Sequence, residues 1–283
     1  MQKKPAMLLH IIWDVSPVIF HFPDWLPLLS GHEVRWYGLL FAASFVVGYI
    51  IMQRVFKREN ISQDVLDVLS TYMLLATIIG ARLGHCLFYE PDYYLAHPIE
   101  ILKVWEGGLA SHGAAIGIIL ALYFFSRKYK KPLIWILDRI VIVVALAGFF
   151  IRTGNLMNSE IFGHITQLPW GFQFVRYYNP DLNTDPRHPT QIYEGLVYLG
   201  TFLFLMHSYF KAKKAETQPA YMFSWFLILV FGSRFLIEFL KEPQVGFESA
   251  MTLNMGQWLS IPFVITGIIL LINSYSKKKT VKR

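Results

Sequence analysis

The sequence predicts an all-α polytopic membrane protein, with seven transmembrane helices and a small extracytoplasmic head that contains short strands. Of the 283 residues, 54% are hydrophobic and only 16% are charged, whereas soluble domains average about 25% charged. The hydrophobic residues fall into runs of about twenty, the length that crosses a hydrocarbon core of roughly 30 Å. Trp and Tyr near the ends of several runs fit the membrane–water interface.

Each expected span is an apolar run bounded by charged or turn-forming residues. In chain order the seven spans are expected at residues 36–55, 67–89, 109–126, 133–151, 189–210, 220–240 and 254–274. Together they make a membrane domain of residues 36–274. Residues 1–35 are expected to be an N-terminal extracytoplasmic or interfacial segment, and residues 275–283 a basic cytoplasmic tail.

Positive charges distinguish the two ends of these spans. The connections after the first, third and fifth spans and the C-terminal tail each contain three to five Lys or Arg residues. The loops at 90–108 and 241–253 contain one each. Because cytoplasmic loops carry the excess of Lys and Arg, we expect the N-terminus outside and the C-terminus in the cytoplasm. Residues 152–188 then form the extracytoplasmic head, in which residues 170–177 alternate like a short strand.

The composition also excludes several kinds of site. The single cysteine, Cys86, excludes an intramolecular disulfide and a cysteine-based zinc site. The chain has no H-E-x-x-H motif, P-loop or G-x-S-x-G element, so we expect no metal and no cofactor. The net charge of +7 is explained by the cytoplasmic loops rather than by a nucleic-acid-binding domain.

Polar residues gather at one depth, the outer ends of the spans. The densest group is the stretch I-R-T-G-N-L-M-N-S-E-I-F-G at 151–163, directly after an apolar run. Arg234, Glu238 and Lys241 are spaced to share one helix face. The other members come from five further spans: Tyr37, Arg82, His85, His112, His188, Gln191, Glu194, Asn254 and Gln257.

Taken singly, these residues have structural explanations. Arg82 is explained about equally well by a side chain that extends to the interface, Arg234 and Glu238 by a structural ion pair, and Lys241 by solvation at a helix end. Taken together they indicate a shared polar cavity open to the outer side, because charged groups at bilayer depth cost roughly 2.5–3.5 kcal/mol each. Arginines, a histidine and side-chain amides suit a phosphate. At the outer leaflet, the natural source of that phosphate is a phospholipid headgroup.

Five motifs occur in one order along the chain: R-W-Y-G at 35–38, G-G-L-A-S-H-G-A at 107–114, the 151–163 stretch, H-P-T-Q-I-Y-E at 188–194 and R-F-L-I-E-F at 234–239. These motifs resemble those of the bacterial prolipoprotein diacylglyceryl transferases, and the resemblance covers about residues 35–258. It implies a multi-pass enzyme of the bacterial cytoplasmic (inner) membrane with its active site toward the outer leaflet. Its partners would be phosphatidylglycerol and the lipobox cysteine of a prolipoprotein. That cysteine would receive the diacylglyceryl group as a thioether, and glycerol phosphate would leave.

The resemblance also implies roles for residues at matching positions. The implied catalytic residues are Tyr37, His112, Arg152, Arg234 and Glu238. The implied phosphatidylglycerol-binding residues are Arg152, Asn155, Asn158, Glu160, Gly163 and Arg234. Residues expected to support the site are Arg82, His188, Gln191 and Glu194. The sequence departs from the family pattern at Val230, where some members have tyrosine, and at Lys241, where some have arginine. We therefore assign no side-chain role to position 230.

The implied reaction needs a thiolate, which is the nucleophilic form of cysteine. His112 suits the base that accepts the thiol proton, although a histidine equally suits a headgroup ligand. Arg152 and Arg234 suit the departing phosphate, with Glu238 holding Arg234. A transporter or flippase for an anionic phospholipid is the main alternative, and a scaffold for exported chains is another. A transporter would show polar groups through the full membrane depth or repeat symmetry between halves, and the sequence shows neither.

Overall fold

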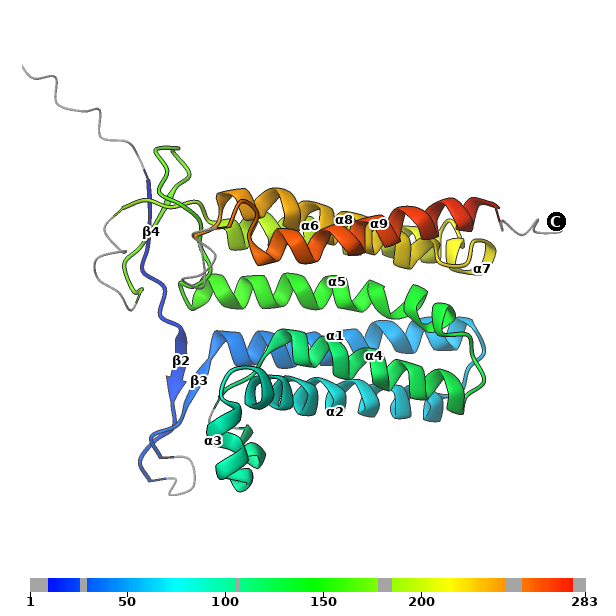
Figure 1. The fold of residues 1–283 in the computed structure, drawn as a ribbon, viewed down its shortest axis with the longest axis horizontal. Helices are drawn as coiled ribbons and strands as arrows, with labels where there is room; N and C mark the ends of the chain where they lie inside the picture. The colour runs from blue at the N-terminus through cyan, green and yellow to red at the C-terminus, as the bar shows by residue number, and fades with distance from the viewer. Residues whose placement is uncertain (1–9, 26–29, 105–106, 178–184, 243–250, 277–283) are drawn as a thin grey trace, which may run out of the picture. The chain divides into compact units, whose positions relative to one another are not determined.

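The computed structural model describes residues 10–25, 30–104, 107–177, 185–242 and 251–276, which are mostly helical (Figure 1). The chain divides into two compact units. The first unit comprises Met1–Gly48 and Val141–Arg283, and the second comprises Tyr49–Ile140.

Every expected span coincides with a helix. The helices are α1 Trp36–Arg58, α2 Gln63–Phe88, α4 Ser111–Lys128, α5 Leu133–Met157, α6 Thr190–Phe210, α8 Tyr221–Ile237 and α9 Met255–Ser276. Short helices lie between them: α3 Pro91–Ala96, the 3-10 turn η1 Pro98–Leu102, α7 Lys214–Thr217 and η4 Glu238–Leu240. Helix α5 extends beyond its expected end at residue 151, so Arg152 and Asn155 lie in the helix and not in the loop where we expected them.

Within the described residues, five helices are long and apolar enough to cross a membrane: α1, α2, α5, α8 with η4, and α9. Helices α4 and α6 fall outside this set. Helix α4 has His112 in its first turn and Arg127 and Lys128 in its last, and α6 includes Glu194 and His207. These polar residues lower the mean hydropathy of the two helices.

Short strands occur in the head, as we expected, and also in the N-terminal segment, where we expected none. Strand β1 (Ile11–Trp13) pairs in parallel with β4 (Phe172–Phe174), which lies inside the segment predicted as a strand. Strands β2 (Val18–His21) and β3 (Glu33–Arg35) form an antiparallel pair directly before α1. Phe172 and Phe174 of β4 form a buried aromatic cluster with Phe162, and Trp13 of β1 packs against it.

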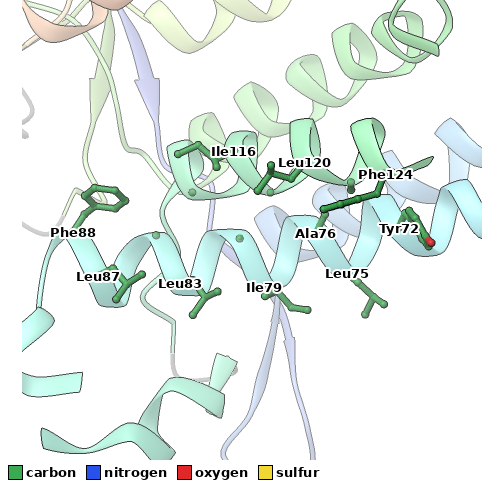
Figure 2. Close-up of a pocket in the computed structure, with 15 residues that line it drawn as sticks. Tyr72, Leu75, Ala76, Ile79, Leu83, Leu87, Phe88, Ile116, Leu120 and Phe124 are labelled. Atoms are coloured by element: carbon green, nitrogen blue, oxygen red, sulfur yellow. The ribbon is translucent and has the colours of Figure 1, made fainter. Parts of the chain in front are cut away.

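In the second unit, α2 and α4 pack backbone against backbone. Each helix carries a Gly-x-x-x-Gly motif, Gly80 and Gly84 on α2 and Gly113 and Gly117 on α4, a pattern that lets membrane helices approach closely. A Cβ atom added to Gly84 would lie 2.6 Å from the Gly113 Cα. Apolar side chains border the groove beside this contact, which has a volume of about 550 Å³ (Figure 2).

In the first unit, α8 packs against both α9 and α6. A Cβ atom on Gly148 of α5 would lie 2.7 Å from the Tyr198 ring of α6, and one on Gly195 of α6 would lie 3.7 Å from the Arg152 Cβ. These small residues bring α5 and α6 close together, so polar side chains on their facing surfaces are buried between them.

Candidate active site

The polar stretch at 151–163 begins as the last turns of α5 and ends in a constrained loop. Ser159 and Ile161 both have positive φ, 54° and 59°, a region that costs a non-glycine residue about 1–3 kcal/mol. Two groups at the start of α6 hold this loop. Thr190 Oγ1 donates to the Ile161 carbonyl at 2.9 Å, and Gln191 Nε2 donates to the Glu160 carbonyl at 2.7 Å. The hydrogen bond from Gln191 to the Glu160 carbonyl is a specific contact that fits the supporting role we expected for Gln191.

Side-chain amides orient Glu160 inside this loop. Its Oε1 accepts hydrogen bonds from Asn155 Nδ2 at 2.8 Å and from Asn158 Nδ2 at 3.2 Å. Asn155 Oδ1 in turn accepts from Arg152 Nη1 at 3.1 Å. Asn155 is buried. The structure therefore brings four of the predicted headgroup-binding residues into one hydrogen-bonded chain.

Gly163 lies where no side chain fits. A Cβ atom there would overlap the Leu240 carbonyl oxygen and would come within 2.8 Å of the His188 Cβ. The Gly163 N–H donates to the His188 carbonyl at 2.8 Å. Gly163 thus joins the 151–163 loop to the segments that lead into α6 and out of η4, which is a packing role.

Arg152 is paired with a fully buried carboxylate. Its Nε lies 2.6 Å from Glu194 Oε2, with Arg152 13% exposed and Glu194 0% exposed. The contact is an ion pair and not an aligned hydrogen bond, because Glu194 Oε2 lacks hydrogen-bond geometry with any described group. Arg152 and Gln191 also line a small cavity of about 160 Å³ between α5 and α6. Tyr198, one turn beyond Glu194, interacts with Arg152 as well.

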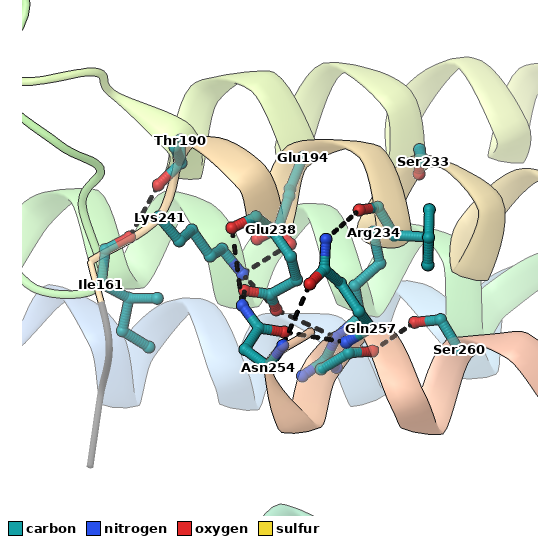
Figure 3. Close-up of polar contacts among 12 residues, drawn as sticks. Ile161, Thr190, Glu194, Ser233, Arg234, Glu238, Lys241, Asn254, Gln257 and Ser260 are labelled. Carbon is teal, nitrogen blue, oxygen red and sulfur yellow. Dashed lines mark hydrogen bonds and ion pairs between the residues drawn. The ribbon is translucent and has the colours of Figure 1, made fainter. Parts of the chain in front are cut away.

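The burial of Lys241 contradicts our prediction for this side chain. We expected its side chain to be solvated at a helix end, but it is only 2% exposed. Its Nζ donates to Glu194 Oε1 at 2.8 Å and to Glu238 Oε1 at 3.2 Å, as Figure 3 shows. Lys241 lies between the partner of Arg152 and the partner of Arg234, and it joins the two ion pairs into one network.

Arg234 is the accessible end of this network. Its Nε is 3.4 Å from Glu238 Oε1, and its side chain is 37% exposed. Within the described part of the chain, the Arg234 Nε has no hydrogen-bond partner. Asn254 Nδ2 donates to Glu238 Oε2 at 3.3 Å (Figure 3), and Gln257 is hydrogen-bonded to Asn254. Glu238 is thus held by Asn254, the residue that precedes α9, while the Arg234 side chain stays partly exposed.

Two further predicted residues of the first unit lie beside the 151–163 stretch. The Tyr37 ring packs on the α5 backbone, because a Cβ atom on Gly154 would lie 2.8 Å from its Cδ2. His188 Nδ1 is 3.2 Å from the Tyr193 hydroxyl. Partial burial and the nearby His164 lower the pKa of His188 below its ordinary value. His188 therefore favours its neutral form.

The second unit contains the remaining predicted residues, His112, Arg82 and His85. His112 is exposed in the first turn of α4. Its ring lies against Phe88, at 5.3 Å between centroids, and Tyr89, at 5.7 Å. Arg82 does not extend to the interface, since it is 3% exposed and its guanidinium donates to backbone carbonyl oxygens.

Sequence reasoning missed Thr190 and Tyr198 and misread Lys241. Tyr198 follows Gln191 and Glu194 at helical spacing. This spacing places the three residues on one face of α6, and Tyr198 could have been predicted from it. The described residues hold no group of three or more His, Cys, Asp or Glu side chains arranged to bind a metal ion.

Comparisons with known proteins identify the family of this chain. The family model described as prolipoprotein diacylglyceryl transferase matches residues 24–273. The chain is similar to phosphatidylglycerol--prolipoprotein diacylglyceryl transferases from three bacteria. It is 45% identical to that of Tolumonas auensis, over 95% of this chain and 99% of the relative. It is 46% identical to that of Chloroherpeton thalassium and 44% identical to that of Porphyromonas gingivalis, each over 96% of this chain and 97% of the relative. With a matching family model across most of its length and relatives at this identity, the chain belongs to the prolipoprotein diacylglyceryl transferase family.

Proposed function

We propose that this protein transfers the diacylglyceryl group of phosphatidylglycerol to the lipobox cysteine of prolipoproteins. The cysteine sulfur forms a bond to the glycerol carbon that carries the phosphate, and the carbon–oxygen bond to the phosphate breaks. The products are a thioether-linked diacylglyceryl cysteine and glycerol phosphate, and the thiol proton passes to a base. The observation that carries this proposal is the buried network in which Glu194, Lys241 and Glu238 hold Arg152 and Arg234.

The two arginines supply charge where the reaction needs it. A phosphate that leaves as a monoester gains negative charge in the transition state, and fixed guanidinium groups in a poorly solvated site stabilise that charge. Arg152 lines a cavity between α5 and α6, and the Arg234 side chain is 37% exposed. Both observations support phosphate binding by these side chains.

The other roles follow from the contacts around Arg152. Asn155, Asn158 and Glu160 form the hydrogen-bonded chain that orients Arg152, and we assign them to headgroup binding. Tyr37 borders α5 at Gly154. His112 is exposed in the first turn of α4, and we assign it the thiol proton. Gly163 has a structural role, because it joins the loop to the neighbouring backbone.

The membrane arrangement is part of the same proposal. Five helices support spans by length and composition, and α4 and α6 complete a set of seven. Lys and Arg in the connections support an extracytoplasmic N-terminus and a cytoplasmic C-terminus. This orientation places the 151–163 stretch and Arg234 at the outer leaflet of a bacterial inner membrane. The alternative of a lipid transporter is not favoured, because the relatives are transferases.

Purified protein in vesicles of phosphatidylglycerol, with a peptide that carries a lipobox cysteine, tests the activity directly. We expect mass spectrometry to detect a diacylglyceryl mass gain on the peptide. The gain should vanish with the Cys→Ser peptide and with Arg152→Ala, and it should persist with the exposed-arginine control Arg54→Ala. A folded protein that binds phosphatidylglycerol but gives no mass gain would refute the transferase, and a lipid-flipping assay would then test the alternative.

A further inference from the structure

The guanidinium of Arg82 on α2 donates hydrogen bonds to backbone carbonyl oxygens of the segment that leads into α4. Its Nε donates to the Ile101 carbonyl at 3.0 Å, its Nη2 to the Glu100 carbonyl at 2.5 Å and its Nη1 to the Gly107 carbonyl at 2.7 Å. A longer contact at 3.4 Å joins Nη1 to the Gly108 carbonyl. The guanidinium also lies over the Tyr94 ring, 5.0 Å from its centroid. These contacts occupy each of its three nitrogens, and the residue is only 3% exposed.

The segment that Arg82 holds leads directly into α4. Gly107 and Gly108 precede Ser111, the first residue of that helix, and the Ala110 N–H donates to the Ala81 carbonyl of α2 at 2.9 Å. One turn further, Gly113 meets α2 at the backbone. The start of α4 is therefore tied to α2 by the Arg82 contacts, by one backbone hydrogen bond and by a close glycine contact.

Gly108 shows how tight this junction is. Its φ of +63° suits glycine. A Cβ atom there would lie 2.8 Å from Arg82 Nη1 and 2.7 Å from His85 Nε2. The backbone of the segment thus lies directly on the Arg82 and His85 side chains, which leave no room for a side chain at position 108.

His112 follows this junction within four residues. Its ring rests on Phe88 and Tyr89 at the C-terminal end of α2, and Tyr89 stacks on His85 at 5.7 Å. The backbone of His112 is located by the segment that Arg82 holds, and its ring is located by the end of the helix that carries Arg82.

We propose that Arg82 is a positioning residue for His112. It fixes the start of α4 through carbonyl contacts and does not itself touch the lipid phosphate. This inference rests on the proposed assignment of His112 to the reaction. It differs from the alternative in which Arg82 binds phosphate, because its nitrogens are already engaged by backbone oxygens and its side chain is buried.

The kinetic test separates the two roles. A displacement of about 1 Å at a reacting group costs about 100-fold in rate. For Arg82→Met we therefore expect kcat to fall about 100-fold while KM for phosphatidylglycerol changes less than about twofold. Arg82→Lys, which keeps the charge and one donor group, should recover part of the lost kcat. An increase in KM with little change in kcat would overturn the proposal in favour of direct phosphate binding.

Gly108→Ala provides an independent variant in which Arg82 is intact. We expect the same fall in kcat with unchanged KM, and the double variant Arg82→Met/Gly108→Ala should be far from additive, since both changes act on one junction. Additive losses would contradict a shared cause. Arg127→Met, at an exposed arginine of α4, is the matched control and should leave both constants unchanged.

Hydrogen–deuterium exchange of the whole protein in detergent tests the junction without any turnover. The amides of residues 107–116 should exchange at least tenfold faster in Arg82→Met than in the wild type or in Arg127→Met. Unchanged exchange would overturn the carbonyl contacts as the cause. Faster exchange with an unchanged kcat would overturn the link to His112. Because this readout needs no substrate, it stands even if the transferase assay fails.

Discussion

Lys241→Met removes the charge at the centre of the buried network and leaves a side chain of similar length. The Lys241 Nζ lies 2.8 Å from Glu194 Oε1 and 3.2 Å from Glu238 Oε1. Both carboxylates are buried. Without the lysine, each carboxylate keeps one cationic partner among the described residues, Arg152 for Glu194 and Arg234 for Glu238. The substitution therefore leaves two poorly compensated negative charges.

The size of the effect follows from this geometry. Removing one partner of a buried ion pair costs about 3–5 kcal/mol of unfolding free energy. The remaining arginines place this case near the lower value, about 3 kcal/mol. At about 2–4 °C per kcal/mol for larger domains, the apparent Tm should fall by roughly 6–12 °C. Turnover should fall as well, because Glu194 and Glu238 both orient the arginines proposed to bind phosphate.

Thermal unfolding in detergent, followed by circular dichroism at one fixed scan rate, measures this change. The scan rate is held constant because membrane proteins often unfold irreversibly. Lys211→Met, at an exposed lysine beyond the end of α6, should stay within about 0.5 kcal/mol of wild type. Lys241→Arg should retain most of the stability, since it keeps the charge. A Tm for Lys241→Met within 1 °C of wild type would refute the reasoning that the lysine joins the two ion pairs.

Four further changes probe other parts of the molecule. Arg234→Lys should lower kcat/KM by roughly 10–100-fold in the vesicle assay, because an ammonium loses the planar fork of the guanidinium, and full activity would argue against bidentate phosphate contact. Gly163→Ala should destabilise the protein by at least about 1–3 kcal/mol, since its Cβ would overlap the Leu240 carbonyl oxygen; an unchanged thermal transition would show that this backbone can move aside. Gly113→Leu should separate the α2–α4 contact, because its Cβ would already lie 2.6 Å from the Gly84 Cα, and normal yield of folded protein in detergent would contradict that packing. The pKa of His188 is lowered in the folded state, so the folded protein binds fewer protons and stability should fall as pH drops below about 6.5; Tm measured between pH 7.5 and 5.5 should decline more in wild type than in His188→Gln, and equal slopes would exclude this histidine as the cause.

The hydropathy of the chain was enough to predict where the helices lie, because each span has to bury a continuous apolar run in lipid. It did not predict where α5 ends. Residues Arg152 and Asn155 are polar, so the apolar run stops before them, yet their side chains find partners on α6 and within the loop. The helix therefore continues to Met157, and the backbone turns into positive φ at Ser159.

The contacts of the site were harder to predict than its members. The spacing of Arg234, Glu238 and Lys241 predicted that they share a face of one helix, but the partner that buries Lys241 is Glu194, 47 residues earlier on α6. Nothing local in the sequence links these two residues. Arg82 shows the same limit, since carbonyl oxygens are its acceptors and every residue type provides one. Side-chain patterns indicate charge and depth, whereas pairing depends on which helices pack together.

The arrangement of charges explains why carboxylates are compatible with the proposed phosphate site. Arg152, Arg234 and Lys241 bring three positive charges, while Glu194 and Glu238 bring two negative ones, so the ion-paired network has one positive charge in excess. A third carboxylate, Glu160, lies nearby, but Asn155 stands between it and Arg152 and hydrogen-bonds to both. The Asn155 amide links Glu160 to Arg152 through two hydrogen bonds. Glu160 therefore helps to orient Arg152 without forming a direct ion pair with its guanidinium. The excess charge then matches the single negative charge of a phosphodiester, and an aspartate in place of Asn155 would cancel it.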